Sequence, residues 1–229
     1  MVSGVQTQKS GSRSPRREAE GQATLIANPA LDSCGAVVLC GGASRRMGRD
    51  KAWLDRLGQP LLAFVVEVIE QICDPVVVVR SPGQTVPDAG RARVVADPEA
   101  HRGPLAGFAT GLRAIPRDIE LVFLAAVDSP LLSAAHIREI VCRLGSSSSD
   151  VVCPLRDGQP SLFFASYRLQ PTLDAVETLV RRGERRLGAV LQELNVEWVD
   201  GHDLKDVDSL RGANTVAEWR QITSLLRPR

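Results

Sequence analysis

The sequence lacks the features that mark membrane-spanning, secreted and nucleic-acid-binding proteins. Its 229 residues contain no apolar run long enough to cross a bilayer. Residues 1–28 contain no signal-peptide core. The formal net charge is only +1, so a general basic surface for nucleic acid is not expected. We therefore expect a protein that has neither a membrane nor a nucleic acid as its partner.

Cysteine pairs with metal-binding or redox spacing are also missing. The five cysteines are odd in number and form no Cys-x-x-Cys pair, which argues against a disulfide framework and against a zinc site. We expect most of them to be small buried hydrophobic residues, and a reducing cytoplasm to be the compartment. The cysteines are Cys34, Cys40, Cys73, Cys142 and Cys153.

Neither of the two common phosphate-binding motifs is present. Walker A requires Gly, four residues and then Gly-Lys-Ser/Thr, whereas here five residues separate Gly42 from Gly48 and Arg49 follows. The dinucleotide fingerprint Gly-x-Gly-x-x-Gly does not fit the adjacent glycines of this chain. Any phosphate site must therefore be of another type.

A different glycine-containing loop does follow an apolar run. Ala36–Cys40 is apolar throughout, as expected of a strand that is covered on both faces. Gly41–Gly42 allows the backbone to lie close to a ligand. Arg45, Arg46 and Lys51 supply cations that can neutralise a triphosphate and stabilise a leaving group. The alternative is an ordinary turn with solvated arginines, but this many cations beside paired glycines favours a phosphate site.

A carboxylate lies at the end of a second predicted strand. The buried run Leu121–Val127 ends at Asp128, and Pro130 then stops the strand. Because a carboxylate there is costly without a cation, and because Mg²⁺ prefers carboxylate and phosphate oxygens, Asp128 is a candidate metal ligand. The alternative is a cap or turn aspartate.

Asp97 also ends a short strand, before the Gly103–Gly107 run. The alternatives there are a simple turn at Asp97 and glycines that only let a helix pack close to the sheet.

Apolar patterns predict alternating strands and helices and therefore an α/β fold: a Rossmann-like three-layer α/β/α sandwich with a mostly parallel sheet. Ligands in such folds lie at the carboxyl ends of the strands, which places the basic loop and Asp128 at one edge. The expected strands are Ala36–Cys40, Val76–Val79, Val94–Ala96, Leu121–Val127, Val151–Cys153 and Ser161–Ala165. The expected helices are Leu61–Ile72, Pro104–Arg113, Ala134–Leu144 capped by Ser133, one with Pro171 in its first turn, and one from the Thr215–Glu218 capping box to Leu226.

Composition divides the chain into an extension and one domain. Residues 1–33 are rich in Ser, Gly, Arg and Gln and have too little apolar content to fold alone, so we expect a disordered N-terminal extension; a basic docking arm is the alternative. Residues 34–229 are long enough for one large core and too short for two full domains. We expect them to form the catalytic domain.

The loop Leu39–Lys51 resembles the signature loop of the molybdenum cofactor guanylyltransferases, which belong to the nucleotidyltransferases that act on nucleoside triphosphates. The family pattern is Leu-Ala-Gly-Gly-x-Ser-x-Arg-Met-Gly-x-Asp-Lys, and Cys40 replaces its alanine. The resemblance extends from about Gly35 to about Leu225 and is more specific in the first half.

This resemblance implies an enzyme that transfers GMP from GTP to molybdenum-bearing molybdopterin with release of pyrophosphate. It implies Mg²⁺ as cofactor, GTP and molybdopterin as substrates, and molybdoenzymes or other cofactor-biosynthesis proteins as candidate partners. Lys51, Arg45 and Arg46 would hold the phosphates and Asp128 the metal. The remaining nucleotide contacts would come from Leu39, Cys40, Gly41, Gly42 and Asp97.

The second half departs from the family pattern in places. Gln159–Pro160 and Gly183–Arg186 resemble the segments on the acceptor side, where the arginines could hold the pterin phosphate. Taken without the resemblance, Arg181, Arg182, Arg185 and Arg186 favour a solvated basic face. Asn214 matches the last asparagine of the family's Asn-x-Asn-Thr segment, and Gly212 stands in place of the first. An asparagine that the family carries after the second strand is absent near Val79 and Arg80.

Three alternatives remain for the activity. The first is a cytidylyltransferase that acts on the same pterin, the second is a related enzyme that uses a sugar phosphate, and the third is a non-catalytic nucleotide sensor or carrier partner. In the family that the chain resembles, Gly-Gly at this position accompanies guanine and Ala-Gly accompanies cytosine, so Gly41–Gly42 implies GTP as the substrate. The presence of both Lys51 and Asp128 favours an enzyme over a sensor.

Overall fold

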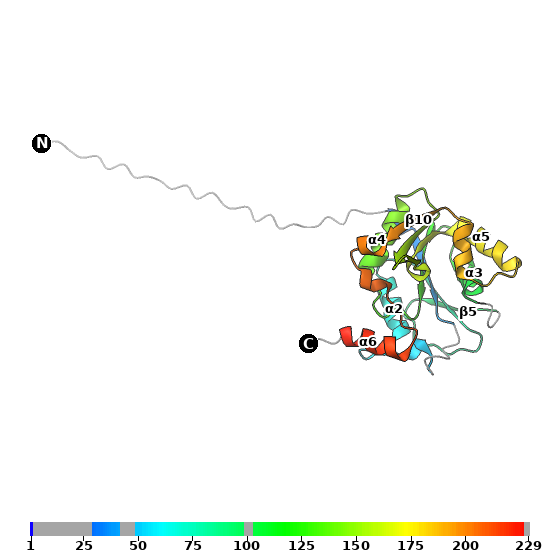
Figure 1. Cartoon of the computed structure of the whole chain (residues 1–229), viewed down its shortest axis with the longest axis horizontal. Helices are drawn as coiled ribbons and strands as arrows, with labels where there is room; N and C mark the ends of the chain where they lie inside the picture. Colours follow the sequence, from blue (N-terminus) through cyan, green and yellow to red (C-terminus); the bar gives the residue numbers. More distant parts are fainter. Residues whose placement is uncertain (2–28, 42–48, 99–102, 227–229) are drawn as a thin grey trace.

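The protein is a three-layer α/β/α sandwich, as the sequence predicts. The computed structural model describes Met1 and residues 29–41, 49–98 and 103–226. A mostly parallel sheet lies between two helix layers, with α2 (Leu61–Ile69) and α4 (Ala134–Gly145) on one side and α3 (Pro104–Ala114) and α5 (Leu169–Arg181) on the other (Figure 1). No helix of these residues is sufficiently long and apolar to cross a membrane.

The main sheet has the strand order β10-β7-β9-β6-β1-β4-β5, with the short β8 paired to β7. All neighbouring pairs of the main order are parallel except those of β9, which runs antiparallel to both β6 and β7. A separate ribbon joins β2 (Asp55–Arg56) to β3 (Gln59–Pro60). The strands of the main sheet are β1 (Cys34–Leu39), β4 (Val76–Arg80), β5 (Arg93–Ala96), β6 (Leu121–Ala126), β7 (Val151–Arg156), β8 (Gln159–Pro160), β9 (Ser166–Arg168) and β10 (Val196–Asp200).

Capping side chains start two of the helices as predicted. The Ser133 hydroxyl accepts a hydrogen bond from the His136 N–H at the start of α4. Thr215 and Glu218 form a reciprocal capping box before α6 (Val216–Leu226), since each side chain accepts from the other residue's N–H. The other helical elements are α1 (Pro29–Asp32) and the 3₁₀ turns η1 (Lys51–Trp53), η2 (Leu162–Phe164), η3 (Leu187–Gln192), η4 (Gly201–Asp203) and η5 (Val207–Leu210).

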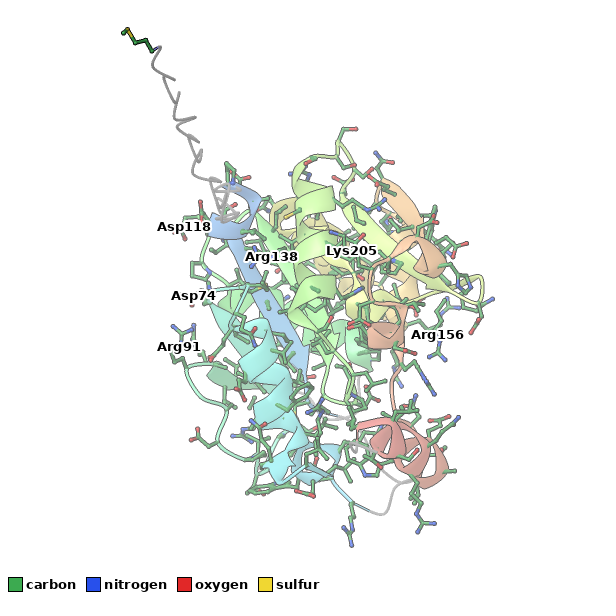
Figure 2. All side chains as sticks on the ribbon, turned by 90° about the vertical axis from the view of Figure 1, so that its left-hand side faces the viewer. Asp74, Arg91, Asp118, Arg138, Arg156 and Lys205 are labelled. Carbon is green, nitrogen blue, oxygen red and sulfur yellow. The ribbon has the colours of Figure 1, made fainter. Side chains whose placement is uncertain are left out.

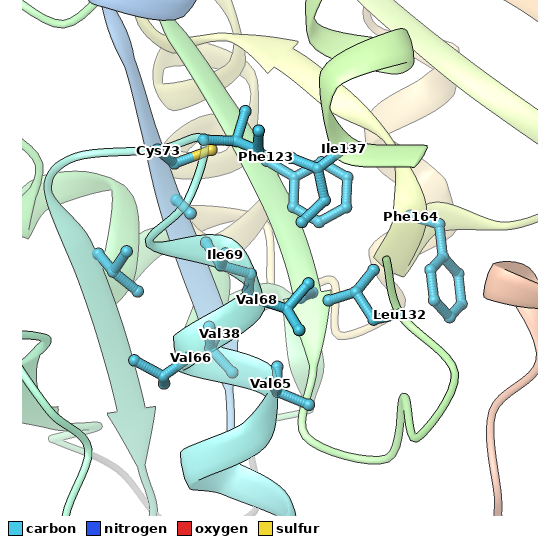
Figure 3. Close-up of a cluster of buried hydrophobic side chains, with 14 of the residues drawn as sticks. Val38, Val65, Val66, Val68, Ile69, Cys73, Phe123, Leu132, Ile137 and Phe164 are labelled. Carbon is cyan, nitrogen blue, oxygen red and sulfur yellow. The ribbon is translucent and has the colours of Figure 1, made fainter. Parts of the chain in front are cut away.

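The apolar run of β1 is explained by burial on both faces. Ala36 and Val38 pack into the cluster beneath α2 and α4, part of which Figure 3 shows, whereas Val37 and Leu39 pack into the cluster beneath α3 and α5. Because both faces of the strand are covered, no polar residue alternates with the apolar ones. Gly111 of α3 has no Cβ and so lets the helix lie directly against Val37.

One predicted strand is wrong. The segment 161–165 contains the turn η2, in which the Phe164 N–H donates to the Ser161 carbonyl, and strand β9 begins only at Ser166. An apolar run as short as Leu162–Phe164 fits a tight turn as well as a buried strand, so its pattern does not decide between them. Strand β10 was not among the predicted strands.

Cys34, Cys40, Cys73 and Cys153 are buried, as predicted, and Cys142 is half-buried. Residues 2–28 of the predicted N-terminal extension lie outside the described part of the chain. The described end of that segment contains α1, whose Ala30 lies against Gly145 of α4. The boundary between residues 33 and 34 stays a prediction.

Candidate active site

A cleft of about 610 Å³ opens at the carboxyl ends of β1 and β6. The register of the sheet pairs Leu39 with Ala126, so the two strands end level and Asp128 emerges beside Gly41. The residues that line the cleft come from both halves of the chain: Leu39, Cys40, Gly41, Lys51, Pro104, Ala126, Val127, Asp128, Arg156, Asp157, Gln159, Pro160, Ser161, Phe163, Phe164, Leu210, Gly212, Asn214 and Glu218.

Lys51 and Asp128 meet in this cleft. Lys51 Nζ donates to Asp128 Oδ2 across 2.6 Å, and their side chains are 16% and 20% exposed. Lys51 is the first residue of η1, and the preceding Asp50 caps this turn: its carboxylate accepts from the Ala52 N–H. The structure thus brings together the cation and the carboxylate that the sequence predicts at one sheet edge.

The segment before α6 completes this corner of the cleft. Asn214 Oδ1 accepts from Lys51 Nζ at 2.9 Å, and the Ala213 N–H donates to the Asp128 carbonyl at 2.9 Å. A Cβ at Gly212 would lie 3.3 Å from the same carbonyl oxygen. A glycine at this position therefore lets the segment approach Asp128 closely, and only Asn214 presents an amide to the lysine.

Glu218 joins the first turn of α6 to this corner. Its Oε2 accepts from the Asn214 N–H at 2.6 Å and from the Thr215 N–H at 3.1 Å. These bonds fix the backbone from which the Asn214 amide extends. The capping box was predictable from the sequence, but its place beside the cleft was not.

The strand end that was predicted to contact the nucleotide lies along the cleft, which Leu39, Cys40 and Gly41 line. The Cys40 and Gly41 N–H groups donate to the Val79 carbonyl at 2.8 and 3.3 Å, so both are engaged within the protein. A Cβ at Gly41 would lie 2.7 Å from Ser81 Oγ, and this close approach requires a glycine. Burial, with the nearby Asp50 charge, raises the pKa of the Cys40 thiol from 9.0 to about 12. At neutral pH this thiol is therefore protonated.

Asp97 lies next to this strand end but is not among the residues that line the cleft. Its N–H donates to the Arg80 carbonyl at 2.8 Å. A Cβ at Gly107 would come within 3.7 Å of Asp97 Oδ2 and 3.6 Å of Leu39 Cδ2. The absence of a side chain at Gly107 therefore lets α3 lie against both residues.

The basic residues near the end of α5 are paired on the surface. Arg186 forms a 2.9 Å ion pair with Glu184, and this interaction lowers the pKa of the Glu184 carboxyl to about 2. Arg181 lies near Glu177, and Arg182 lies near Glu193. Arg181, Arg182, Arg185 and Arg186 do not line the cleft, which favours the solvated basic face over a substrate site. Gly42, Arg45 and Arg46 lie outside the described residues.

Arg156 is a cleft residue that the sequence analysis missed. It ends β7, its Nη1 donates to the Leu210 carbonyl at 3.4 Å, and its Nε lies 3.7 Å from Asp157 Oδ2. Asp157 and Gly158 have positive φ values of 52° and 73° in the turn to β8. The Asp-Gly pair between two extended segments was a signal for this hairpin. Figure 2 places Arg156 on the opposite side of the molecule from Arg91.

The donors around Lys51 suit a magnesium–phosphate complex. Asp128 and Asn214 present oxygen atoms, which Mg²⁺ prefers, and neither histidine nor thiolate faces them in the cleft. Within residues 29–41, 49–98 and 103–226, no group of three or more His, Cys, Asp or Glu side chains gathers to hold a metal. The donor set therefore fits an ion that takes most of its ligands from phosphates and water rather than from the protein.

Comparison with known proteins identifies related sequences. The family model described as MobA-like NTP transferase domain matches residues 36–198. A probable molybdenum cofactor guanylyltransferase of Mycobacterium avium is 35% identical over 189 residues, which cover 81% of this chain and 93% of the relative. A protein with the same description from Mycobacterium tuberculosis H37Rv is 37% identical over 182 residues, which cover 77% of this chain and 89% of the relative.

Solved structures share the fold. Molybdopterin-guanine dinucleotide biosynthesis protein A of Archaeoglobus fulgidus superposes with a TM-score of 0.68 at 22% identity, over 84% of this chain and 98% of the other. A 4-diphosphocytidyl-2C-methyl-D-erythritol synthase of Anaerococcus prevotii superposes with a TM-score of 0.64 at 12% identity, over 88% of this chain and the whole of the other. At these identities, the likeness shows the fold alone.

Proposed function

The chain belongs to the MobA-like NTP transferase family, and from that premise we propose that it transfers GMP from GTP to molybdenum-bearing molybdopterin with release of pyrophosphate. The observation that carries this proposal is the meeting of Lys51 and Asp128 in a cleft at the carboxyl edge of the sheet. The relatives at 35% and 37% identity support guanine as the base.

The proposed reaction is a direct displacement at phosphorus. An oxygen of the acceptor's terminal phosphate forms a bond to the α-phosphorus of GTP, and the bond from that phosphorus to the bridging oxygen of the β-phosphate breaks. Pyrophosphate leaves with the electron pair. The attacking phosphate is already an anion, so no protein nucleophile is needed. The protonated Cys40 thiol agrees with this scheme.

Catalysis then consists of alignment and charge neutralisation. Good alignment alone can lower the barrier by roughly 7–11 kcal/mol. In this proposal Lys51 neutralises phosphate charge, which includes the charge that develops on the leaving pyrophosphate. Asp128, with Asn214 beside it, would hold Mg²⁺, which supplies Lewis-acid polarisation of phosphate oxygens when it is bound.

The other sequence-predicted roles are part of the same proposal. Arg45 and Arg46 would hold the outer phosphates of GTP. Main-chain groups of Leu39–Gly41 would contact the base, and Gly42 and Asp97 would add contacts to the nucleotide. Because the Cys40 and Gly41 N–H groups already donate to Val79, base recognition in this stretch would rely on other main-chain and side-chain groups.

Arg156 is our candidate for the acceptor end of the cleft. Among the lining residues that the structure describes, the positive charges are those of Lys51 and Arg156. Lys51 is neutralised by Asp128 at 2.6 Å, whereas Arg156 is 3.7 Å from the exposed Asp157 carboxylate. The planar guanidinium of Arg156 suits a phosphate, and we assign it to the phosphate of the acceptor.

The product would pass to molybdoenzymes or to other proteins of cofactor biosynthesis, and we expect the reaction to take place in the cytoplasm. The test of nucleotide choice is a thermal-shift comparison of GTP and CTP in the presence of Mg²⁺. A larger shift with GTP supports the proposal, and a larger shift with CTP supports a cytidylyltransferase instead. Release of pyrophosphate on addition of molybdopterin separates an enzyme from a nucleotide sensor, which would release none.

A further inference from the structure

The loop after β4 contacts the chain at two places: at Cys40 and Gly41, where β1 has ended, and at Asp50, just before η1. We call residues 81–85 the brace. The Ser81 N–H donates to Gln84 Oε1 at 2.9 Å, and the Gln84 N–H donates to the Ser81 carbonyl at 3.1 Å. Arg80 Nη1 donates to the Gln84 carbonyl at 2.9 Å. These bonds fix the position of the Gln84 side chain.

The Gln84 amide nitrogen joins two points that are far apart in the sequence. Its Nε2 donates to Asp50 Oδ2 at 2.8 Å and to the Cys40 carbonyl at 3.3 Å. A side-chain amide has two N–H donors, and these two oxygens use both. Oε1 is held by Ser81, and Nε2 also lies 3.8 Å from Cys40 Sγ, so the whole amide is engaged and its orientation is set by Ser81, Cys40 and Asp50.

The two points held by Gln84 border the proposed nucleotide loop. Cys40 directly precedes Gly41, and Asp50 directly precedes Lys51 and caps η1. The brace makes two more contacts at the same places. Ser81 fills the space that a side chain at Gly41 would need, and the Thr85 carbonyl accepts from Trp53 Nε1 at 3.2 Å. One short segment therefore fixes both the entry to the loop and the turn that carries Lys51.

From these contacts we propose that Gln84 is a positioning residue for Lys51: it fixes Cys40 and Asp50 so that Lys51 meets the phosphates in the required place. The proposal rests on the proposed function for its consequence in catalysis. The donor must be neutral and must carry two N–H groups, because a carboxylate at this position would repel Asp50 and leave the Cys40 carbonyl without this donor.

The first test compares Gln84→Ala with the control Gln170→Ala. Gln170 also donates to a carboxylate, that of Asp174 at 2.9 Å, but on α5 and outside the cleft. Isothermal titration with GTP and Mg²⁺ should show about tenfold weaker binding for Gln84→Ala, the scale of a lost hydrogen bond to a charged group, and unchanged binding for Gln170→Ala. Equal affinities for the wild type and Gln84→Ala would overturn the proposal.

A rescue experiment excludes a merely structural role. Gln84→Glu should weaken GTP binding more than Gln84→Ala, because two carboxylates then face each other. In the double variant Gln84→Glu with Asp50→Asn, the N–H₂ group of the new asparagine can donate to the new glutamate carboxylate. The amide oxygen of that asparagine can still accept from the Ala52 N–H. The double variant should bind GTP more tightly than Gln84→Glu alone. A double variant that binds no better than Gln84→Glu contradicts the proposed contact.

Hydrogen exchange separates this proposal from the proposed function. Without any nucleotide, Gln84→Ala should speed amide exchange at Ala52, Trp53 and Leu54, whose N–H groups bond to Asp50 and Lys51, while exchange in α5 stays unchanged. Unchanged exchange at these amides would overturn the positioning role. If exchange rises but the wild-type protein binds no GTP, the brace is supported and the proposed function fails.

Discussion

The Lys51 ammonium lies 2.6 Å from the Asp128 carboxylate, and the Asn214 amide accepts from the same ammonium group. These residues come from three distant segments of the chain, and they meet because β1 and β6 end at the same level of the sheet. A cation and a carboxylate held in one cleft can serve the two parts of a magnesium nucleotide, the phosphates and the metal.

Asp128→Asn should lower GMP transfer at least a hundredfold, because the metal loses its charged protein ligand. The fold should persist. The ion pair with Lys51 is partly exposed, so its loss should lower the free energy of unfolding by only about 1 kcal/mol. Steady-state transfer assays and thermal unfolding measure the two effects. Asp174→Asn on α5 is the control and should transfer GMP normally. Normal transfer by Asp128→Asn would rule out the metal assignment.

Arg156→Ala should raise the KM for the molybdopterin acceptor at least tenfold, the scale of a lost charge-assisted hydrogen bond. The affinity for GTP should stay the same, because we assign this side chain to the acceptor end of the cleft. Arg138→Ala is the matched control, because Arg138 lies on α4 (Figure 2) and is not among the residues that line the cleft. An Arg156→Ala variant with a normal KM for the acceptor and weakened GTP binding would reverse the assignment.

Cys40→Ala should retain transfer activity, since the thiol is not a nucleophile in the proposed scheme. Burial raises the pKa of this thiol to about 12, so little thiolate forms at neutral pH. Alkylation of Cys40 by iodoacetamide in the folded protein should therefore be slow at pH 7 and increase up to the highest pH at which the fold persists. Loss of turnover in a well-folded Cys40→Ala variant would mean that the thiol takes part in the reaction.

The stability of the fold should fall as the pH drops below about 6.5, the pKa of an unperturbed histidine. His136 is fully buried between Phe123 and Phe164, and burial lowers its pKa, although the Phe164 carbonyl and the charges of Asp206 and Glu139 oppose this. The unfolded chain therefore binds a proton that the folded protein does not, so this contribution to stability is present above about pH 6.5 and decreases below it.

Urea unfolding at pH 7 and pH 5 measures this effect. The wild type should lose unfolding free energy between pH 7 and pH 5 through His136, by no more than about 1.4 kcal/mol per pH unit, the limit for one proton. His136→Phe should reduce that slope, and the exposed His202→Gln control should keep it. The same slope in His136→Phe as in the wild type would show that another group is responsible.

The fold was largely predictable because its central strands are buried on both faces. Runs such as Val76–Val79 and Leu121–Val127 can be placed only in the middle of a covered sheet, and the helices between them carry one apolar side. The prediction of a strand over residues 161–165 was wrong because a three-residue apolar run is compatible with either a turn or a strand. Strand β10 was missed at the sheet edge, where its Trp198 is exposed and the apolar pattern is weaker.

The site was predictable only where a residue carries its own local signal. Lys51 follows paired glycines and Asp128 ends a buried strand, so each could be placed at the carboxyl edge. Gln84 and Arg156 have partners fixed by tertiary contacts: Gln84 reaches Cys40 and Asp50 from the loop after β4, and Arg156 reaches the Leu210 carbonyl from the end of β7. Sequence spacing carries no information about such contacts.

The most direct test of the central claim is incubation of the purified protein with α-labelled GTP, Mg²⁺ and molybdenum-loaded molybdopterin. The account predicts that the label appears in a guanine dinucleotide product together with one equivalent of pyrophosphate, and that Lys51→Met and Asp128→Asn each abolish both. Absence of labelled product from the wild-type protein, or full product formation by these two variants, would contradict it.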